Sequence, residues 1–94
     1  MSGDAALRID AWLWRARFFK TRALAATFVE GGRVRLTRHG QETRPDKASR
    51  TVRPGDELVF AIDGRLIAVR VEALGMRRGP AAEAAALYCP LENN

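Results

Sequence analysis

The residues of this sequence best suited to chemistry are arginines that gather between positions 15 and 36. This stretch, RARFFKTRALAATFVEGGRVRL, carries six cationic side chains, five of which are arginine. A guanidinium group presents its N–H donors as a planar fork that matches the geometry of phosphate. The cluster is therefore suited to gripping a sugar-phosphate backbone, and the competing interpretation is a solvated surface that binds nothing.

The distribution of charge along the chain favours a binding surface. Of the net charge of +5, residues 1–55 contribute +7, from twelve Arg and Lys against five Asp and Glu. Residues 56–94 contribute −2, from four against six. Such asymmetry is typical of a protein with one side that faces a polyanion. Nucleic acid is the first candidate partner, an anionic membrane surface is the second, and uneven charge without a partner is the third.

Length and composition indicate one folded domain over residues 1–94, which we expect to be a monomer. Hydrophobic residues make up 47% and charged residues 29%, which excludes a disordered chain. No apolar run approaches the roughly 18 residues needed to span a bilayer. The start, MSGDAALRID, lacks the basic-then-apolar pattern of a signal peptide, and Cys89 alone cannot form an internal disulfide. These features predict a cytoplasmic protein without a membrane partner.

The side chains that usually carry catalysis or bind metals are few and scattered. His39 is the single histidine, with no cysteine or carboxylate at metal-ligand spacing, and Cys89 has no histidine near it in the sequence. The glycines form neither a Walker-type phosphate loop nor a dinucleotide fingerprint. Asp56 and Glu57 are adjacent acids whose expected role is turn formation and solvation. We therefore expect no enzyme, no metal and no cofactor.

Two short helices joined by a basic corner are predicted near the start of the chain. Asp10 can cap the first helix and Thr21 the second, each through a side-chain oxygen. Gly31-Gly32 can end the second helix in a left-handed conformation. Phe18 and Phe19 are expected to wedge the corner rather than to touch a ligand.

Strands are predicted in the middle of the chain. Residues 33–36, RVRL, alternate as a half-buried strand does, and residues 38–50 read as a long turn or irregular loop. The apolar runs on either side of Asp63-Gly64 predict a hairpin with a type I′ turn, in which Phe60 faces Ile67. A third helix is expected from residue 80 to residue 88, ended by Pro90.

The start of the second helix is where cationic side chains and backbone donors should meet. Free N–H groups point out of a helix N-terminus, and the helix dipole favours an anion there. An N-terminus at Thr21 would thus form a seat for phosphate, in contact with a sugar-phosphate backbone. The cationic side chains around this seat are Arg17, Lys20, Arg22, Arg33 and Arg35.

Several short motifs in this order resemble the S4 RNA-binding domain. They are Arg8-Ile9-Asp10, Thr21-Arg22, Gly32-Arg33-Val34 and Gly55-Asp56. Within that family, residues 12–25, WLWRARFFKTRALA, and residues 77–88, RRGPAAEAAALY, are similar to the ribosome-associated heat-shock protein 15 group. The resemblance covers residues 8–60 for the domain and extends to about residue 88 for the group.

The resemblance implies an α+β fold, with two N-terminal helices packed on a small, mostly antiparallel sheet (S4-like, αL motif) and a short C-terminal helix. The S4 core would span about 8–60, and the hairpin and C-terminal helix about 58–88. Helix starts and the segment after the glycines would form the RNA surface. The complete set of expected RNA-binding residues is Arg8, Arg15, Arg17, Lys20, Thr21, Arg22, Arg33, Arg35 and Arg44.

The function implied by the resemblance is non-catalytic binding of ribosomal RNA on the large ribosomal subunit. The group acts on stalled subunits that still carry a nascent chain on tRNA, so peptidyl-tRNA is a further expected partner. A generic accessory protein for ribosomal RNA or tRNA maturation is the alternative. A membrane-surface module is a third class, but neither basic helix has an exposed apolar face to insert.

The sequence departs from the family pattern in two ways, one in the segment 38–50 and one at its end. Arg38-His39-Gly40 stands where the family commonly has Asn-Gly, and Arg44-Pro45-Asp46 stands where it has Lys-Pro-Ser. The basic C-terminal extension typical of the group is not found, since the sequence ends in ENN. Trp14 has two open interpretations, stacking on an RNA base or packing beneath the third helix.

Overall fold

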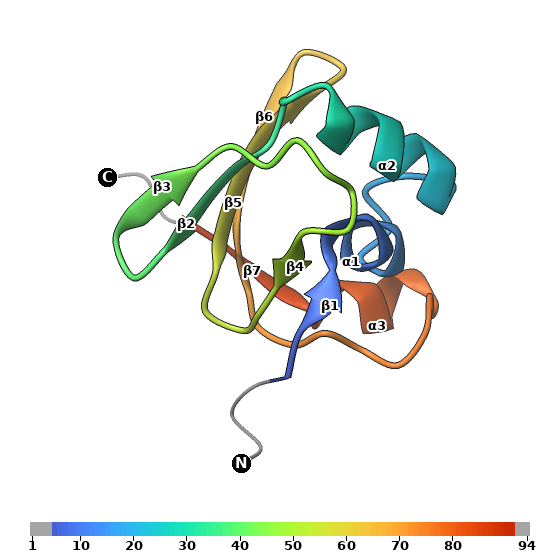
Figure 1. Ribbon diagram of the computed structural model, residues 1–94. Helices are drawn as coiled ribbons and strands as arrows, with labels where there is room; N and C mark the ends of the chain where they lie inside the picture. The colour runs from blue at the N-terminus through green and yellow to red at the C-terminus, as the bar shows by residue number, and fades with distance from the viewer. Residues whose placement is uncertain (1–4, 92–94) are drawn as a thin grey trace.

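The computed structural model describes residues 5–91 (Figure 1). Residues 1–4, which begin the segment tested for a signal pattern, and residues 92–94, the ENN ending, lie outside the described residues. The described helices are α1 (Ile9–Arg15), α2 (Arg22–Glu30) and α3 (Ala81–Ala85). The described strands are β1 (Leu7–Arg8), β2 (Arg35–Arg38), β3 (Gln41–Thr43), β4 (Thr51–Val52), β5 (Glu57–Ile62), β6 (Arg65–Val71) and β7 (Tyr88–Pro90).

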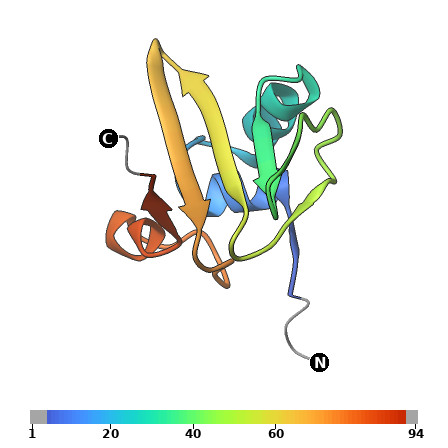
Figure 2. The ribbon, with the colours of Figure 1, turned by 90° about the vertical axis from the view of Figure 1, so that its left-hand side faces the viewer.

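Five of these strands form one sheet in the order β3-β2-β5-β6-β7, in which all neighbours are antiparallel. Strands β1 and β4 form a separate two-stranded ladder, also antiparallel. In Figure 2 the strands β2, β5 and β6 cross the front of the molecule, and α1 and α2 lie behind them. The expected α+β architecture, with two N-terminal helices on an antiparallel sheet and a short C-terminal helix, is confirmed.

The hydrophobic core lies between α1, α2 and the covered face of the sheet. Trp12 and Leu13 of α1 are fully buried in one cluster with Leu36 of β2 and Leu58 of β5. Burying side chains of this size contributes about 1.5–3 kcal/mol each, so this layer fixes α1 against the strands. The indole N–H of Trp12 donates to the Ala73 carbonyl at 2.9 Å, which satisfies its one polar group.

The start of α1 differs from the sequence prediction. The helix begins at Ile9, one residue before Asp10, and its cap position belongs to Arg8 without a side-chain cap bond. Asp10 therefore lies in the first turn and not at the cap position, so the predicted cap is wrong. Its carboxylate is instead taken by arginine side chains, described below, which are stronger partners than backbone amides.

The predicted start and end of α2 are confirmed. The Thr21 hydroxyl oxygen accepts a hydrogen bond from the Leu24 N–H at 3.0 Å. Gly32 has a φ of +72°, the left-handed conformation that commonly follows a helix and that glycine adopts without a steric penalty. Strand β2 then begins three residues later, at Arg35.

The corner between the helices is closed by backbone and aromatic contacts. Arg17 has a φ of +67°, and the Phe18 N–H donates to the Leu13 carbonyl at 3.1 Å, which is the usual six-residue closure of a helix end. Phe18 packs among aromatic rings of the core, and Phe19 packs on Phe28 with ring centroids 5.0 Å apart. The expected wedging role of the two corner phenylalanines is confirmed.

One hairpin was predicted correctly and a second was missed. In the β5–β6 hairpin Phe60 pairs with Ile67, and Asp63-Gly64 has φ angles of +52° and +76°, as a type I′ turn requires. Residues 38–50 were expected to be irregular, yet β2 and β3 pair across His39-Gly40, with φ angles of +52° and +77°. Because residues 38–50 are mostly polar, their sequence did not indicate this second two-residue turn with positive φ angles.

Helix α3 is shorter than predicted. It ends at Ala85 rather than near residue 88, because the chain turns to form β7 along the edge of β6. Buried Leu87 makes this turn, and its carbonyl accepts from the Glu72 N–H at 2.8 Å. Pro90 is tolerated in β7 because this strand lies at a sheet edge.

Candidate nucleic-acid interface

A buried carboxylate links the starts of α1 and α2. Asp10 is only 3% exposed, and Arg8 donates to its two oxygens at 3.1 Å from Nε and 3.0 Å from Nη2. Arg22 reaches the same carboxylate from α2, with 3.4 Å between Nη2 and Oδ1. Both arginine side chains remain about half exposed. Asp10 thus holds two guanidinium groups together at the surface.

Opposing effects act on the pKa of Asp10. Burial raises this pKa because it disfavours the charged form. The hydrogen bonds from Arg8 and the Ala11 amide lower the pKa, as do the charges of Arg8 and Arg22. The net result is a pKa below the ordinary value of an aspartate, so the two arginines keep the carboxylate ionised.

Asp10→Asn should lower the free energy of unfolding by about 1–3 kcal/mol at neutral pH, because both arginines lose the charge that they share. The pKa of Asp10 is lower in the folded chain, so its contribution is complete above the unfolded pKa of about 3.9 and is lost as pH falls below it. The stability gap between wild type and variant, measured by urea unfolding, should therefore narrow on acidification. A gap that does not change with pH would contradict ion pairing at Asp10.

The N-terminus of α2 offers a smaller seat for an anion than the sequence suggested. Thr21 occupies the Leu24 amide, and the amides of Arg22 and Ala23 have no hydrogen-bond partner within residues 5–91. Lys20 is exposed directly before this turn. One phosphate could therefore meet two backbone donors and two cationic side chains here.

Arg15 and Arg17 are bound elsewhere, to the loop that precedes α3. Arg15 Nη1 donates to the Gly75 carbonyl at 2.8 Å, and Arg17 Nη1 donates to the Gly79 carbonyl at 2.8 Å. These bonds pin residues 74–79 to the end of α1. Both arginines therefore have a structural task that the sequence did not predict.

Trp14 is half-buried, which agrees with packing more than with stacking on a ligand. Arg78, from the loop before α3, lies against it. The Arg78 guanidinium lies 6.0 Å from the centre of the Trp14 ring, and Arg78 Nε donates to the Trp14 carbonyl at 3.1 Å.

Arg33, Arg35 and Arg44 gather at the other end of α2, where they line one hollow beside Gly32. The Arg33 guanidinium lies 4.4 Å from the centre of the Phe28 ring, a cation–π contact. Arg35 Nε lies 3.4 Å from a Glu42 carboxylate oxygen. Apart from Arg15 and Arg17, the predicted cationic residues therefore divide into two surface groups, one at Asp10 and one at Gly32, instead of surrounding a single seat.

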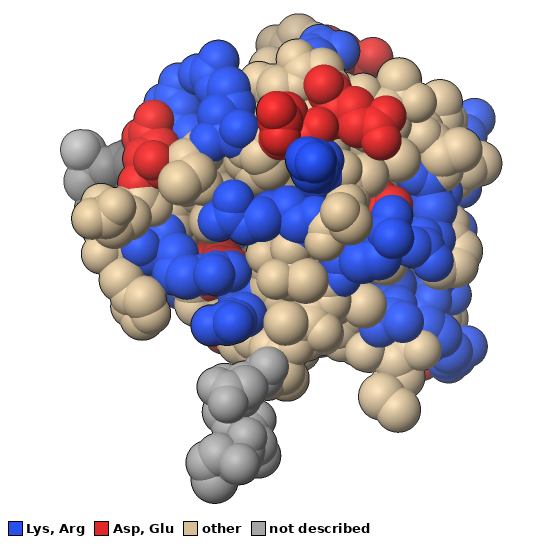
Figure 3. Space-filling view, viewed as in Figure 1, with Lys and Arg blue, Asp and Glu red and all other residues tan. Residues whose placement is uncertain are grey.

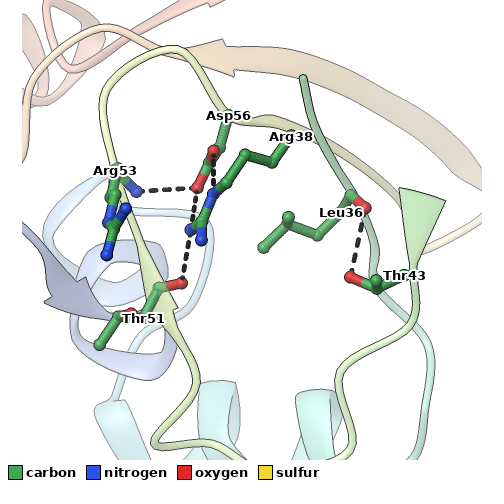
Figure 4. Close-up of polar contacts among 6 residues, drawn as sticks. All are labelled: Leu36, Arg38, Thr43, Thr51, Arg53 and Asp56. Carbon is green, nitrogen blue, oxygen red and sulfur yellow. Dashed lines mark hydrogen bonds and ion pairs between the residues drawn. The ribbon is translucent and has the colours of Figure 1, made fainter. Parts of the chain in front are cut away.

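A second buried carboxylate, that of Asp56, holds the turn before β5 (Figure 4). Asp56 is 2% exposed and accepts from Arg38 at 2.9 Å and 2.8 Å, and from the Arg53 backbone N–H at 2.8 Å. Arg38 also donates to the Thr51 carbonyl at 3.2 Å. The expected turn role of Asp56 is confirmed, but its expected solvation is wrong, because the Arg38 guanidinium takes the place of water.

The pairing of β1 with β4 brings one more arginine, Arg53, to the side of the ladder that carries Arg8. Arg8 pairs with Thr51, and the Ile9 N–H donates to the Arg50 carbonyl at 2.7 Å. Arg53 follows Thr51 by two residues, so it lies on the same side of this ladder as Arg8. The sequence pattern did not place Arg53 in the site, because nothing local signals a pairing between such distant segments.

The space-filling view shows how these side chains gather on one face. Lys and Arg form a band across the middle of the face that carries β1, β4 and the start of α1, and the band continues toward the α2 side (Figure 3). Asp and Glu on this face lie mainly along its upper part.

Within residues 5–91, no group of three or more His, Cys, Asp and Glu side chains is placed to hold a metal ion. None of the described helices has both the length and the apolar character needed to cross a membrane.

Comparison with known proteins gives consistent matches. Residues 7–36 match the family model of the S4 domain. The chain is 44% identical over 87 residues to Heat shock protein 15 of Escherichia coli strain K12, which covers 87% of this chain and 58% of that protein. It is 35% identical over 68 residues to the RQC P-site tRNA stabilizing factor of Bacillus subtilis strain 168, which covers 72% of this chain and 73% of that protein. The trimeric structure of Vibrio cholerae Heat Shock Protein 15 matches with a TM-score of 0.78 and 36% identity, over 93% of this chain and 83% of that chain.

The α+β fold is therefore of the S4 type. The chain belongs to the S4 domain family and, within it, to the heat shock protein 15 group. It spans a little over half, 58%, of the length of the E. coli protein. The matched residues 7–36 contain Arg8, Asp10 and Arg22, which the structure joins in one cluster.

Proposed function

We propose that this chain is a non-catalytic RNA-binding protein that holds an RNA backbone on the face around Asp10. The observation that carries this proposal is the fixing of Arg8 and Arg22 by one buried carboxylate, with both side chains half exposed. The planar guanidinium groups of these arginines match the geometry of phosphate oxygens, and the two free amides at the start of α2 add neutral donors beside them. Membership of the S4 family supports RNA as the polyanion.

The proposed contacts follow from where the structure places each side chain. Arg15 and Arg17 are bonded to the loop before α3, and we assign them the task of positioning that loop. The proposed phosphate contacts are Arg8, Lys20, Thr21, Arg22, Arg33, Arg35 and Arg44, with Arg53 added by the β1–β4 pairing.

The particle that we propose as partner is the large ribosomal subunit in the cytoplasm, with a nascent chain still attached to tRNA. The name of the B. subtilis relative describes a factor that stabilizes P-site tRNA, which supports a ribosomal setting. Membership of the heat shock protein 15 group agrees with the ribosomal setting that the sequence resemblance implies. We expect the chain to be a monomer, although the V. cholerae relative is described as trimeric.

Affinity for ribosomal RNA should fall steeply as salt is raised. If the face around Asp10, which we call the arginine face, neutralises roughly four to six phosphates, the slope of log K against log salt concentration should be about −3 to −5. Fluorescence anisotropy of a labelled ribosomal RNA fragment, titrated at a series of salt concentrations, measures this slope. A slope near zero would exclude backbone contact as the main source of affinity.

Sedimentation tests the proposed particle. The protein is added to a lysate in moderate salt, and its amount is compared on free large subunits, small subunits and intact ribosomes, with and without peptidyl-tRNA. We expect enrichment on large subunits that carry peptidyl-tRNA. Equal binding to every fraction would reject this partner and leave a general RNA-binding accessory protein.

A further inference from the structure

A hollow of about 210 Å³ opens at the end of α2, beside Gly32. Arg33, Arg35 and Arg44 stand around it. Its remaining walls are apolar and come from the β5–β6 hairpin, including Val59, Ala61 and Leu66. A cationic rim around an apolar surface suits a ligand with one anionic part and one flat apolar part.

The strand register explains how these side chains meet. Arg35 pairs with Val59, and Ala61 pairs with Leu66, so all four side chains lie on the same face of the sheet. The neighbours Leu36 and Leu58 point the other way and are fully buried. The face that carries the hollow is therefore the one that α1 and α2 leave uncovered, which is turned toward the viewer in Figure 2.

The parts of the rim differ in how firmly they are held. Arg33 rests on the Phe28 ring, and Arg35 is near Glu42. Arg44 is exposed and forms no ion pair within residues 5–91, so its charge is uncompensated there. Leu66 is 69% exposed, which is a large apolar surface to leave in water.

We propose that this hollow binds one unpaired nucleotide of the RNA held on the arginine face. The base lies against Val59, Ala61 and Leu66, and the phosphate of the same nucleotide meets Arg44 and Arg33. The hollow is smaller than the roughly 300–1,000 Å³ of sites that enclose drug-sized ligands, so it suits a single base. The proposal rests on the RNA-binding function proposed above and adds a preference for a bulge or loop over a continuous duplex, whose bases stay stacked.

The test compares two RNA hairpins that are identical except for one unpaired nucleotide in the stem. The wild-type protein should bind the bulged hairpin about 5-fold more tightly or better, which is a difference of about 1 kcal/mol in binding free energy, because the unpaired base buries apolar surface against the hollow. Leu66→Ser removes one wall, and Ala61→Leu fills the space without changing charge. Each variant should bring the ratio of the affinities for the bulged and the paired hairpin close to 1, while the affinity for the paired hairpin stays the same. Both positions are exposed, so either variant should fold.

Met76→Ser is the matched control, because Met76 is another exposed apolar residue, 92% exposed, and it lies outside this hollow. It should leave the preference for the bulged hairpin unchanged. Equal binding of both hairpins by the wild type, or a preference that survives both hollow variants, would overturn the nucleotide site while RNA binding stands. If neither hairpin bound to the wild-type protein, the proposed RNA-binding function itself would be rejected.

Discussion

Arg22→Gln should weaken RNA binding about 10-fold, and Arg22→Glu about 100-fold, in moderate salt. A hydrogen bond to a charged partner is worth about 1.5–3 kcal/mol, and every 1.4 kcal/mol is tenfold in affinity. Arg22 lies at the first turn of α2 beside the free amides, and its side chain is half exposed, so it can bond Asp10 and a phosphate at once. Anisotropy titration with a ribosomal RNA fragment measures the change.

Arg70→Gln is the matched control for this prediction. Arg70 also lies near a carboxylate, 3.5 Å from Glu72, and its side chain is similarly exposed. It pairs with Glu57 in the sheet and so stands in an acidic neighbourhood away from α2. Its loss should leave RNA affinity nearly unchanged. Equal losses from the two variants would mean that a diffuse positive field, and not the site at Asp10, is responsible.

Asp56→Ala should lower the free energy of unfolding by about 3–5 kcal/mol. The substitution removes the acceptor of three hydrogen bonds and leaves the Arg38 guanidinium, whose side chain is only 24% exposed, without its counter-charge. Domains of this kind are stable by roughly 5–15 kcal/mol in total, so the variant should lose a large share of its stability. Guanidinium unfolding measures the difference.

Glu42→Ala gives the comparison for an exposed ion pair, whose arginine, Arg35, belongs to the same strand β2 as Arg38. Glu42 lies 3.4 Å from Arg35, and both side chains are about half exposed. An exposed ion pair contributes about 0–1 kcal/mol, so this variant should be close to wild type. If Glu42→Ala cost as much as Asp56→Ala, burial would not be the source of the strength of the Arg38–Asp56 pair.

Local signals in the sequence predicted the elements that depend on neighbouring residues. Asp63-Gly64 predicted its hairpin because a type I′ turn needs two residues with positive φ, and Thr21 predicted the start of α2 because its oxygen reaches an amide three residues on. His39-Gly40 carried the same kind of signal as Asp63-Gly64. It was missed because the segment after it is polar and short, and its strand β3 is exposed throughout.

Features that depend on distant pairing could not be read from the sequence. The ladder of β1 with β4, and the strand β7 that replaces the end of α3, are set by where the sheet and core leave room for them. Propensity within residues 80–88 favours a helix, but the free edge of β6 and the burial of Leu87 stop it at Ala85.

The candidate site was predicted in composition but not in arrangement. The sequence pattern indicated arginines near the start of α2. It also predicted that Asp10 caps a helix and that the Asp56 side chain is solvated, and the structure shows neither. In the structure both carboxylates are buried counter-charges for arginines, and Arg15 and Arg17 bind carbonyl groups of a distant loop. Such partners are chosen by three-dimensional proximity, for which residue spacing carries no signal.

Crosslinking in living cells, followed by sequencing of the attached RNA, tests most directly that the Asp10 arginine face binds RNA of the large subunit. Large- and small-subunit ribosomal RNAs are made in equal numbers, so their crosslinks per nucleotide can be compared without correction for abundance. We predict strong enrichment of large-subunit RNA with the wild type and loss of that enrichment when Arg8 and Arg22 are both changed to Gln. Equal crosslinking per nucleotide to both subunits, unaffected by those two changes, would contradict the account.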